Sequence, residues 1–369
     1  MDEPVIPDYG GACIAGLVPA IFACLDGSRA PSWLPHELAG ARQVVLMVVD
    51  GLGWEQLQER GSSAPFLSSL PGRPIDSVVP STTPVALTSI TTGTPPGRHG
   101  VTGVVVRHST TTLNTLRWTV DGADARQMVD PMAFQPVTPF CGRAGVPVVT
   151  KAMFEGSGLT TAHLRTSRQV GWELPSGIPV EVGRLLDEGA RFVYAYYDGV
   201  DHAAHRYGLG EHYEAELASA DRLVAAIADA LPAGAALAVT ADHGQVEVVR
   251  PEVGIDAALL DVVDVVSGES RLRWLHAKAG CRDELIAGAK ELFSDVAWVR
   301  SAEEAIAERW FGPDVAPWFT ERIGDVAIAA KGVLAVGGGG PHDVERQLVS
   351  LHGSLTPAEM RVPLLIASA

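Results

Sequence analysis

The sequence lacks any uninterrupted apolar run of the length that a membrane-spanning helix needs. Of its 369 residues, 47% are hydrophobic and 20% are charged, which is typical of a soluble globular protein. The first residues, Met1-Asp2-Glu3-Pro4, are acidic where a secretory signal would be basic. We therefore predict a cytoplasmic protein that has no membrane partner.

Cysteine is also scarce. The four cysteines are widely separated and form no Cys-x-x-Cys pair, which argues against a disulfide framework and against a thiolate zinc site. We expect all of them to be buried as small apolar side chains. They are Cys13, Cys24, Cys141 and Cys281.

Acidic residues outnumber basic ones: the sequence has 28 lysines and arginines and 44 aspartates and glutamates, which gives a formal net charge of -16. A sequence-independent grip on a nucleic-acid backbone needs a basic face, so no nucleic-acid polymer is expected as a partner. An acidic protein can still bind a small anionic substrate where metal ions reverse the field locally. The sequence carries no signal for the oligomeric state.

Short apolar runs that alternate with helical segments are what the sequence does contain. The runs at residues 42–50, 145–150, 191–197 and 235–241 predict strands that are covered on both faces. The alternation predicts an α/β fold with a doubly wound, mostly parallel central sheet and helices on both faces.

The rhythm changes between residues 251 and 324, where a strand, a helix and another strand predict a small inserted α+β cap. The core would then comprise residues 1–250 and 325–369, with strands at 326–331 and 362–368 returning to the main sheet. Residues 101–139 combine short β-like pieces with polar turns and are expected to pass over the site. Four consecutive glycines at 337–340 form the only low-complexity tract.

Potential metal ligands follow several of these strands and loops. They are Asp50, Asp201 with His205, Asp242 with His243, and His352. Carboxylates and neutral imidazoles suit zinc, manganese or a related divalent ion, and six such ligands suffice for two ions that keep open positions. Each element alone has an ordinary explanation, such as a turn cap or a hydrogen-bonded pair. A second register, Asp198 with His202, has the same four-residue spacing and stays open.

A candidate nucleophile lies where Pro80-Ser81-Thr82-Thr83-Pro84 leads into a helix that ends at Gly93. Pro84 suits the first helical position, which places Thr83 at the N-cap beside free backbone N–H groups. A phosphate at this helix end would meet those donors and the positive end of the helix dipole. Thr82 is the alternative nucleophile.

Taken together, these motifs resemble the alkaline phosphatase superfamily, and within it the nucleotide pyrophosphatase/phosphodiesterase branch. In chain order they are Asp50-Gly51, Pro80-x-x-Thr83 leading to Thr-Gly, Asp201-x-x-x-His205-x-x-Gly208, Asp242-His243-Gly244 and His352-Gly353. The correspondence covers residues 42–250 and 345–369. Each motif alone is weak, whereas the set is specific.

The resemblance implies a hydrolase that acts on phosphoric esters or anhydrides with two divalent ions, zinc first and manganese as the alternative. One ion would be held by Asp201, His205 and His352, and the other by Asp50, Asp242 and His243 with the Thr83 oxygen. Coordination to a dication activates a threonine hydroxyl, so the resemblance implies a covalent phospho-threonine that water then releases. The substrate would be a small phosphorylated molecule such as a nucleotide.

One departure from the family pattern concerns the substrate. Family diesterases often carry Asn three residues after the threonine to bind a phosphate oxygen, whereas this chain has Ala86. A phosphomonoesterase or phosphonate hydrolase of the same superfamily is therefore the alternative to a phosphodiesterase/nucleotide pyrophosphatase, and the substrate-binding residues stay unassigned. A hypothesis from another class is a non-catalytic, metal-stabilised binding module. Thr83 beside a complete ligand set argues against it.

Overall fold

The structure is a computed structural model that describes residues 3–249, 252–338 and 344–369. The predicted core boundary at 250/251 and the second half of the glycine tract lie outside the described residues. Within the described part of the chain, no helix is both long and apolar enough to cross a membrane.

A seven-stranded sheet forms the centre of the molecule, in the order β2-β17-β10-β1-β9-β7-β8. The strands are β1 (Gln43–Val49), β2 (Gly72–Asp76), β7 (Pro147–Lys151), β8 (Arg168–Trp172), β9 (Phe192–Tyr197), β10 (Ala235–Thr240) and β17 (Arg361–Ser368). β1 pairs in parallel with β9 and β10, and β7 pairs in parallel with β8 and β9. β17 is antiparallel to both β10 and β2. The predicted mixed α/β fold with a large, mostly parallel sheet is confirmed.

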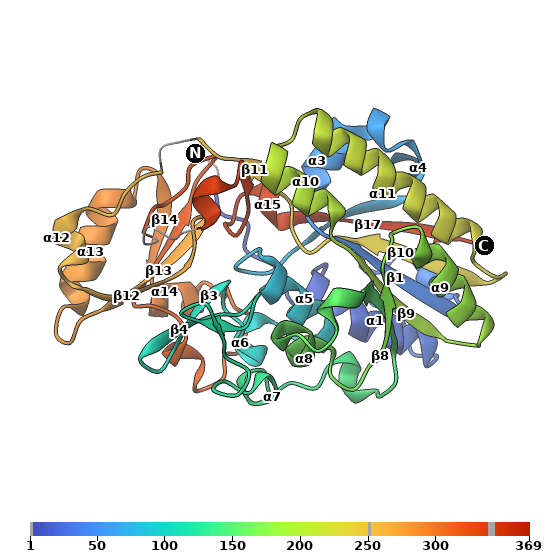
Figure 1. Cartoon of the computed structure of the whole chain (residues 1–369), viewed down its shortest axis with the longest axis horizontal. Helices are drawn as coiled ribbons and strands as arrows, with labels where there is room; N and C mark the ends of the chain where they lie inside the picture. Colours follow the sequence, from blue (N-terminus) through green and yellow to red (C-terminus); the bar gives the residue numbers. More distant parts are fainter. Residues whose placement is uncertain (1–2, 250–251, 339–343) are drawn as a thin grey trace.

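Helices cover both faces of this sheet (Figure 1), with α9, α10 and α11 on one side and α1, α5 and α8 on the other. The helices are α1 (Leu17–Leu25), α2 (His36–Ala39), α3 (Trp54–Glu59), α4 (Pro65–Ser69), α5 (Thr83–Thr92), α6 (Pro96–His99), α7 (Pro131–Phe134), α8 (Gly158–Leu164), α9 (Gly177–Asp187), α10 (Gly199–Tyr207), α11 (Glu211–Asp229), α12 (Ala257–Leu260), α13 (Arg282–Phe293), α14 (Ala302–Ala307) and α15 (Pro357–Met360). Every residue of β9 and β10 is buried. Both faces of the sheet are therefore shielded from water at these strands, which explains why their sequences are continuous apolar runs.

The cap is built on a second, antiparallel sheet in the order β12-β13-β15-β14 (Figure 1, orange). Its strands are β12 (Val263–Glu269), β13 (Leu272–Ala277), β14 (Ala297–Ser301) and β15 (Val326–Ala330). The prediction that residues 326–331 return to the main sheet is wrong, since β15 pairs with β13 and β14. A fully buried apolar strand looks the same in either sheet, so only its tertiary partners decide its place. This pairing moves the end of the cap past the predicted residue 324.

Aromatic side chains join the cap to the core in one buried cluster. Trp274, Trp298, Trp310, Phe311 and Phe319 of the cap pack with Val79, Leu355 and Met360 of the core. The predicted excursion at 101–139 contains a third sheet, of β3 (Val105–His108), β4 (Thr111–Asn114), β5 (Thr119–Val120) and β6 (Ala123–Asp124). β11 (Val246–Glu247) and β16 (Ser350–Leu351) form a short antiparallel ladder that leads to His352.

The cysteines are all free. Cys13 and Cys24 are buried as expected, and Cys281 is partly buried. The expectation is wrong for Cys141, which is exposed in the short 3-10 helix Phe140–Gly142 and has a φ of 53°.

Candidate active site

The carboxyl edge of the main sheet brings the predicted ligands together. Asp50 follows β1, Asp242 and His243 follow β10, and α10, which follows β9, carries Asp201 and His205. His352 arrives from the far end of the chain, directly after β16. Parallel strands place their carboxyl ends at one edge, which explains the convergence of the first three segments.

Gly51 allows two of these segments to meet. Its φ of 73° suits glycine, and a Cβ there would lie 2.9 Å from the Cα of Asp201. The Gly51 N–H donates to Asp242 Oδ1 at 3.1 Å, and the Asp201 N–H donates to the carbonyl of Asp50 at 3.1 Å. The backbone around Gly51 thus positions three of the ligand residues relative to one another.

Two groups of side chains have the spacing that a metal ion needs. Potential ligand atoms of Asp50, Asp242 and His243 lie within 4.8 Å of one another, and so do those of Asp201, His243 and His352. His205 adjoins the second group, with its Nε2 3.3 Å from Asp201 Oδ1 and 3.2 Å from His352 Nε2. The rings of His243 and His352 stack with centroids 3.5 Å apart.

All three imidazoles present the same nitrogen to the centre of the site. Nδ1 of His205 donates to the carbonyl of Ser350 at 2.7 Å, and Nδ1 of His352 donates to that of Ser81 at 3.0 Å. Nδ1 of His243 donates to the carbonyl of Gly244 at 3.1 Å. Because a carbonyl only accepts, each Nδ1 carries the hydrogen and each Nε2 keeps a free lone pair, as in histidines that bind metals.

Two carboxylate oxygens are buried here without a hydrogen-bond donor. Asp50 Oδ1 and Asp242 Oδ2 have no partner, and they lie 3.4 and 3.3 Å from His243 Nε2. Burial, followed by the nearby Asp242 and Asp201 carboxylates, raises the pKa of Asp50 well above its ordinary value. Burial is also the main cause that raises the pKa of Asp242, and it lowers the pKa of His352.

These atoms form a donor set that suits a divalent cation. Bare imidazole nitrogens and unpartnered carboxylate oxygens are the ligands that zinc and manganese prefer, and a cation would relieve the cost of burying them. The residues present therefore fit the predicted metal chemistry.

The entrance of α5 differs from the prediction in register. Thr82 is the N-cap with extended backbone, Thr83 is the first helical residue and Pro84 the second, so the prediction of Thr83 as N-cap is wrong by one residue. The Thr83 hydroxyl lies 3.1 Å from His243 Nε2. Thr82 is buried, and its hydroxyl has no hydrogen-bond partner. The Thr83 hydroxyl thus contacts one of the predicted ligands, whereas the Thr82 hydroxyl makes no hydrogen bond to any of them.

Hydroxyl groups let α5 be buried although it is rich in threonine. Thr88, Thr91 and Thr92 each donate to the carbonyl four residues earlier, at 2.6 to 2.9 Å. Ser89 bonds His99 Nε2 at 2.8 Å, while His99 Nδ1 accepts from the Val101 N–H. Burial lowers the pKa of His99 to about 3, and both ring nitrogens are held by local hydrogen bonds.

The second ligand register that the sequence left open does not converge on the cluster. Asp198 pairs with Lys151 at 2.9 Å, and His202 lies with Asp198 along the wall of the neighbouring pocket. Asp201 and His205 are the pair whose side chains meet His352.

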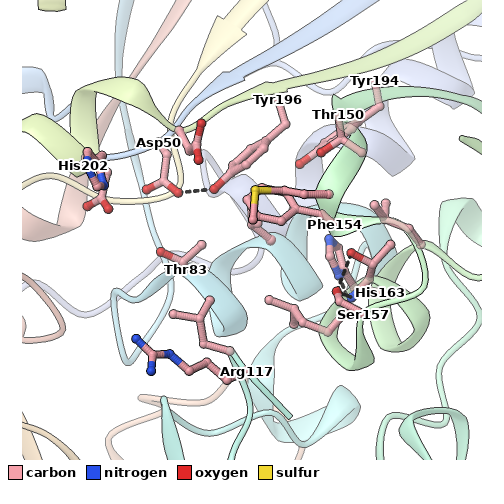
Figure 2. Close-up of a pocket in the computed structure, with 18 residues that line it drawn as sticks. Asp50, Thr83, Arg117, Thr150, Phe154, Ser157, His163, Tyr194, Tyr196 and His202 are labelled. Atoms are coloured by element: carbon pink, nitrogen blue, oxygen red, sulfur yellow. Dashed lines mark hydrogen bonds between the residues drawn. The ribbon is translucent and has the colours of Figure 1, made fainter. Parts of the chain in front are cut away.

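A pocket of about 420 Å³ opens beside Thr83. Its lining residues are Asp50, Thr83, Leu87, Leu116, Arg117, Thr150, Met153, Phe154, Ser157, Leu159, Thr160, His163, Leu164, Tyr194, Tyr196, Asp198, Asp201 and His202. Figure 2 shows Asp50 and Thr83 on one side of this space and the side chains of residues 150–164 on the other. None of these residues comes from the described part of the predicted cap, so the cap does not line this pocket.

Sequence reasoning missed several residues of the site. Gln245 is buried, and its Nε2 donates to Asp201 Oδ1 while its Oε1 accepts from the Ser350 hydroxyl at 3.0 Å. The Tyr196 hydroxyl donates to Asp50 Oδ2. Gln245 directly follows Asp242-His243-Gly244, which is the one signal that could have drawn attention to it. Arg117 carries no such signal.

A buried ion pair holds the loop that carries His352. Glu359 pairs with Arg271 of the cap at 2.7 Å, and both side chains are fully buried. Glu359 also accepts from the Ser354 N–H at 3.0 Å and from the Thr356 hydroxyl. The cap therefore contributes to the site by supporting the His352 loop.

Residues 44–355 match the family of type I phosphodiesterases / nucleotide pyrophosphatases. The chain belongs to this family. The suspected branch of the alkaline phosphatase superfamily is thereby confirmed, and with it the assignment as an enzyme that acts on phosphoric esters. No curated protein sequence matches the chain.

Solved structures of the same fold include murine ectonucleotide pyrophosphatase / phosphodiesterase 5, with 17% identity and a TM-score of 0.65 over 89% of this chain and 88% of that one. Phosphonoacetate hydrolase from Sinorhizobium meliloti 1021, in complex with phosphonoformate, has 21% identity and a TM-score of 0.65 over 89% and 91%. An inactive threonine-to-alanine variant of the murine protein, in complex with AMP, has 16% identity and a TM-score of 0.63 over 88% of each chain.

Proposed function

We propose that this family member hydrolyses phosphoric ester or anhydride bonds of a small phosphorylated substrate through a covalent phospho-threonine at Thr83. One observation carries the proposal. The Thr83 hydroxyl lies at a helix entrance, 3.1 Å from an imidazole nitrogen that two unpartnered carboxylate oxygens also face. This geometry supports a nucleophile that lies directly beside a cation site.

Two divalent cations fit the ligand atoms, with zinc first and manganese as the alternative. Asp201, His205 and His352 would hold one of them, and Asp50, Asp242, His243 and Thr83 the other. When bound, the cations supply Lewis acidity, which favours the alkoxide of Thr83 and neutralises the charge of the phosphoryl oxygens.

The residues of the chain have distinct roles in the two steps. In the first, Thr83 Oγ1 forms a bond to phosphorus as the bond to the leaving group breaks, and the leaving group departs with a proton. In the second, water attacks phosphorus, the bond to Oγ1 breaks and Thr83 regains its proton. The product released is a phosphomonoester when the substrate is a diester or nucleotide pyrophosphate, and phosphate when it is a monoester. The structure supports Thr83 rather than Thr82 as the nucleophile, because Thr83 lines the pocket and Thr82 does not.

The substrate is proposed to be a phosphodiester or nucleotide pyrophosphate, following the family. The AMP complex of a murine relative supports a nucleotide. A phosphomonoester or phosphonate is the second candidate, and the buried Ala86 favours it, because its methyl group offers no donor to the phosphate of a diester.

Rapid acid quench during turnover, followed by peptide mass spectrometry, tests the covalent step. We expect a phosphoryl group on Thr83. Thr83→Ala should abolish both the adduct and turnover without changing metal content, whereas Thr82→Val should retain both, because the Thr82 hydroxyl has no partner to lose. An adduct on Thr82, or full activity in Thr83→Ala, would contradict the proposal.

A further inference from the structure

Arg117 is the one lysine or arginine among the residues that line the pocket beside Thr83. The other cation close to this space, Lys151, already pairs with Asp198 at 2.9 Å. Within the described residues, no carboxylate forms an ion pair with Arg117, and its guanidinium makes no hydrogen bond. Figure 2 shows Thr83 between Asp50 and Arg117.

The backbone that presents Arg117 is held firmly. The Arg117 N–H donates to Asn114 Oδ1 at 2.9 Å in the turn between β4 and β5. The next residue, Trp118, is fully buried, and its indole N–H donates to the carbonyl of Val129 at 2.8 Å. A Cβ at Gly158 would lie 2.1 Å from the Trp118 ring, so the turn packs directly against the start of α8.

Trp118 has a φ of 55°, which is uncommon for a residue with a bulky side chain. Such a conformation persists only where the surrounding structure imposes it, and here the indole is locked between α8 and the ring of Phe134. The turn is therefore a rigid support rather than a free loop, and it holds Arg117, whose side chain is exposed, at the wall of the pocket.

We propose that Arg117 binds the second anionic oxygen of a terminal phosphoryl or phosphonyl group. The inference rests on the proposed function and favours its second candidate, a phosphomonoester or phosphonate, because these groups carry two free anionic oxygens. A guanidinium matches two such oxygens with two parallel N–H donors, whereas a diester offers one charge shared over its free oxygens. Ala86 cannot donate a hydrogen bond to the substrate. Arg117 lies on the Thr83 side of the pocket, and no carboxylate of the described residues pairs with it, so its guanidinium is free to donate to an anionic oxygen.

The test compares p-nitrophenyl phosphate with bis-p-nitrophenyl phosphate in the wild type, Arg117→Leu and Arg117→Lys. Arg98→Leu is the matched control, because Arg98 is an exposed arginine near the same excursion that does not line the pocket. We expect Arg117→Leu to lower kcat/KM for the monoester by about 10- to 100-fold and for the diester by less than about 3-fold. Arg117→Lys should recover part of the loss, since lysine keeps the positive charge but lacks the two parallel N–H donors of the guanidinium. Arg98→Leu should match the wild type.

Binding of inorganic phosphate, measured by calorimetry on the metal-loaded Thr83→Ala protein with and without each arginine substitution, gives a readout that needs no turnover. Arg117→Leu should weaken phosphate binding by about 10- to 100-fold, and Arg98→Leu should not change it. Equal losses on both esters, or unchanged phosphate binding, would overturn the role of Arg117. If the wild type hydrolyses neither ester, the proposed function fails, while phosphate binding still decides the role of Arg117.

Discussion

Replacement of Gln245 by leucine removes the hydrogen bond to Asp201 Oδ1, together with the one that Gln245 accepts from the Ser350 hydroxyl, while keeping similar side-chain volume. The Gln245 amide donates to Asp201 Oδ1, the same oxygen that lies 3.3 Å from His205 Nε2 and 3.7 Å from His352 Nε2. The amide is itself fixed by Ser350, whose carbonyl orients His205. Gln245 thus aligns an acid and an imidazole of one proposed ion site.

Two independent estimates give the expected loss of metal affinity. A hydrogen bond to a charged group contributes about 1.5–3 kcal/mol, and 1.4 kcal/mol corresponds to a factor of ten, so its loss predicts about 10- to 100-fold weaker binding. Removal of a group that orients a metal ligand has the same typical effect on metal affinity, about 10- to 100-fold. We therefore expect Gln245→Leu to weaken binding of one zinc ion by that amount.

Competition with a chromogenic chelator measures this affinity directly. Gln135→Leu is the matched control, because Gln135 is also a fully buried glutamine with hydrogen bonds to Val137 and Ala162, away from the ligands. Both variants should lose thermal stability, but only Gln245→Leu should lose metal affinity. Wild-type zinc affinity in Gln245→Leu, or an equal loss in Gln135→Leu, would falsify the positioning role.

Two further predictions address the metal and the cap. Asp242→Ala should lose one of two bound ions and shrink the rise in melting temperature that added zinc produces, because bound metal stabilises only the folded state; two ions per chain in this variant would refute the ligand assignment. Glu269 is fully buried, and burial raises its pKa from 4.5 to about 8. Above pH 4.5 the unfolded chain releases this proton and the folded chain keeps it, so the free energy of unfolding should fall by up to about 1.4 kcal/mol per pH unit between pH 4.5 and about 8. Glu269→Gln should lack this contribution in denaturant titrations across that window, and identical pH slopes in the two proteins would contradict it.

Local patterns sufficed for much of the fold. The apolar runs before Asp50 and Asp242 are buried central strands, and their acids stand at the sheet edge, because a strand covered on both faces must be apolar until it emerges. The same reasoning placed β15 wrongly, since burial alone does not name the neighbouring strand. The one-residue error at Thr83 has a similar origin, because proline is accepted at either of the first two helical positions.

The chemistry of the site was visible in residue types and spacing: carboxylates, imidazoles and a threonine beside a helix entrance follow from the chain itself. The spacing alone could not choose between Asp198 with His202 and Asp201 with His205, since both pairs are four residues apart, although the family pattern favoured Asp201 with His205. Only the packing of α10 against β16 decides which pair meets His352. Gln245 and Arg117 likewise acquire roles from neighbours distant in the chain, because hydrogen bonds and pocket walls form between segments whose approach no local pattern encodes.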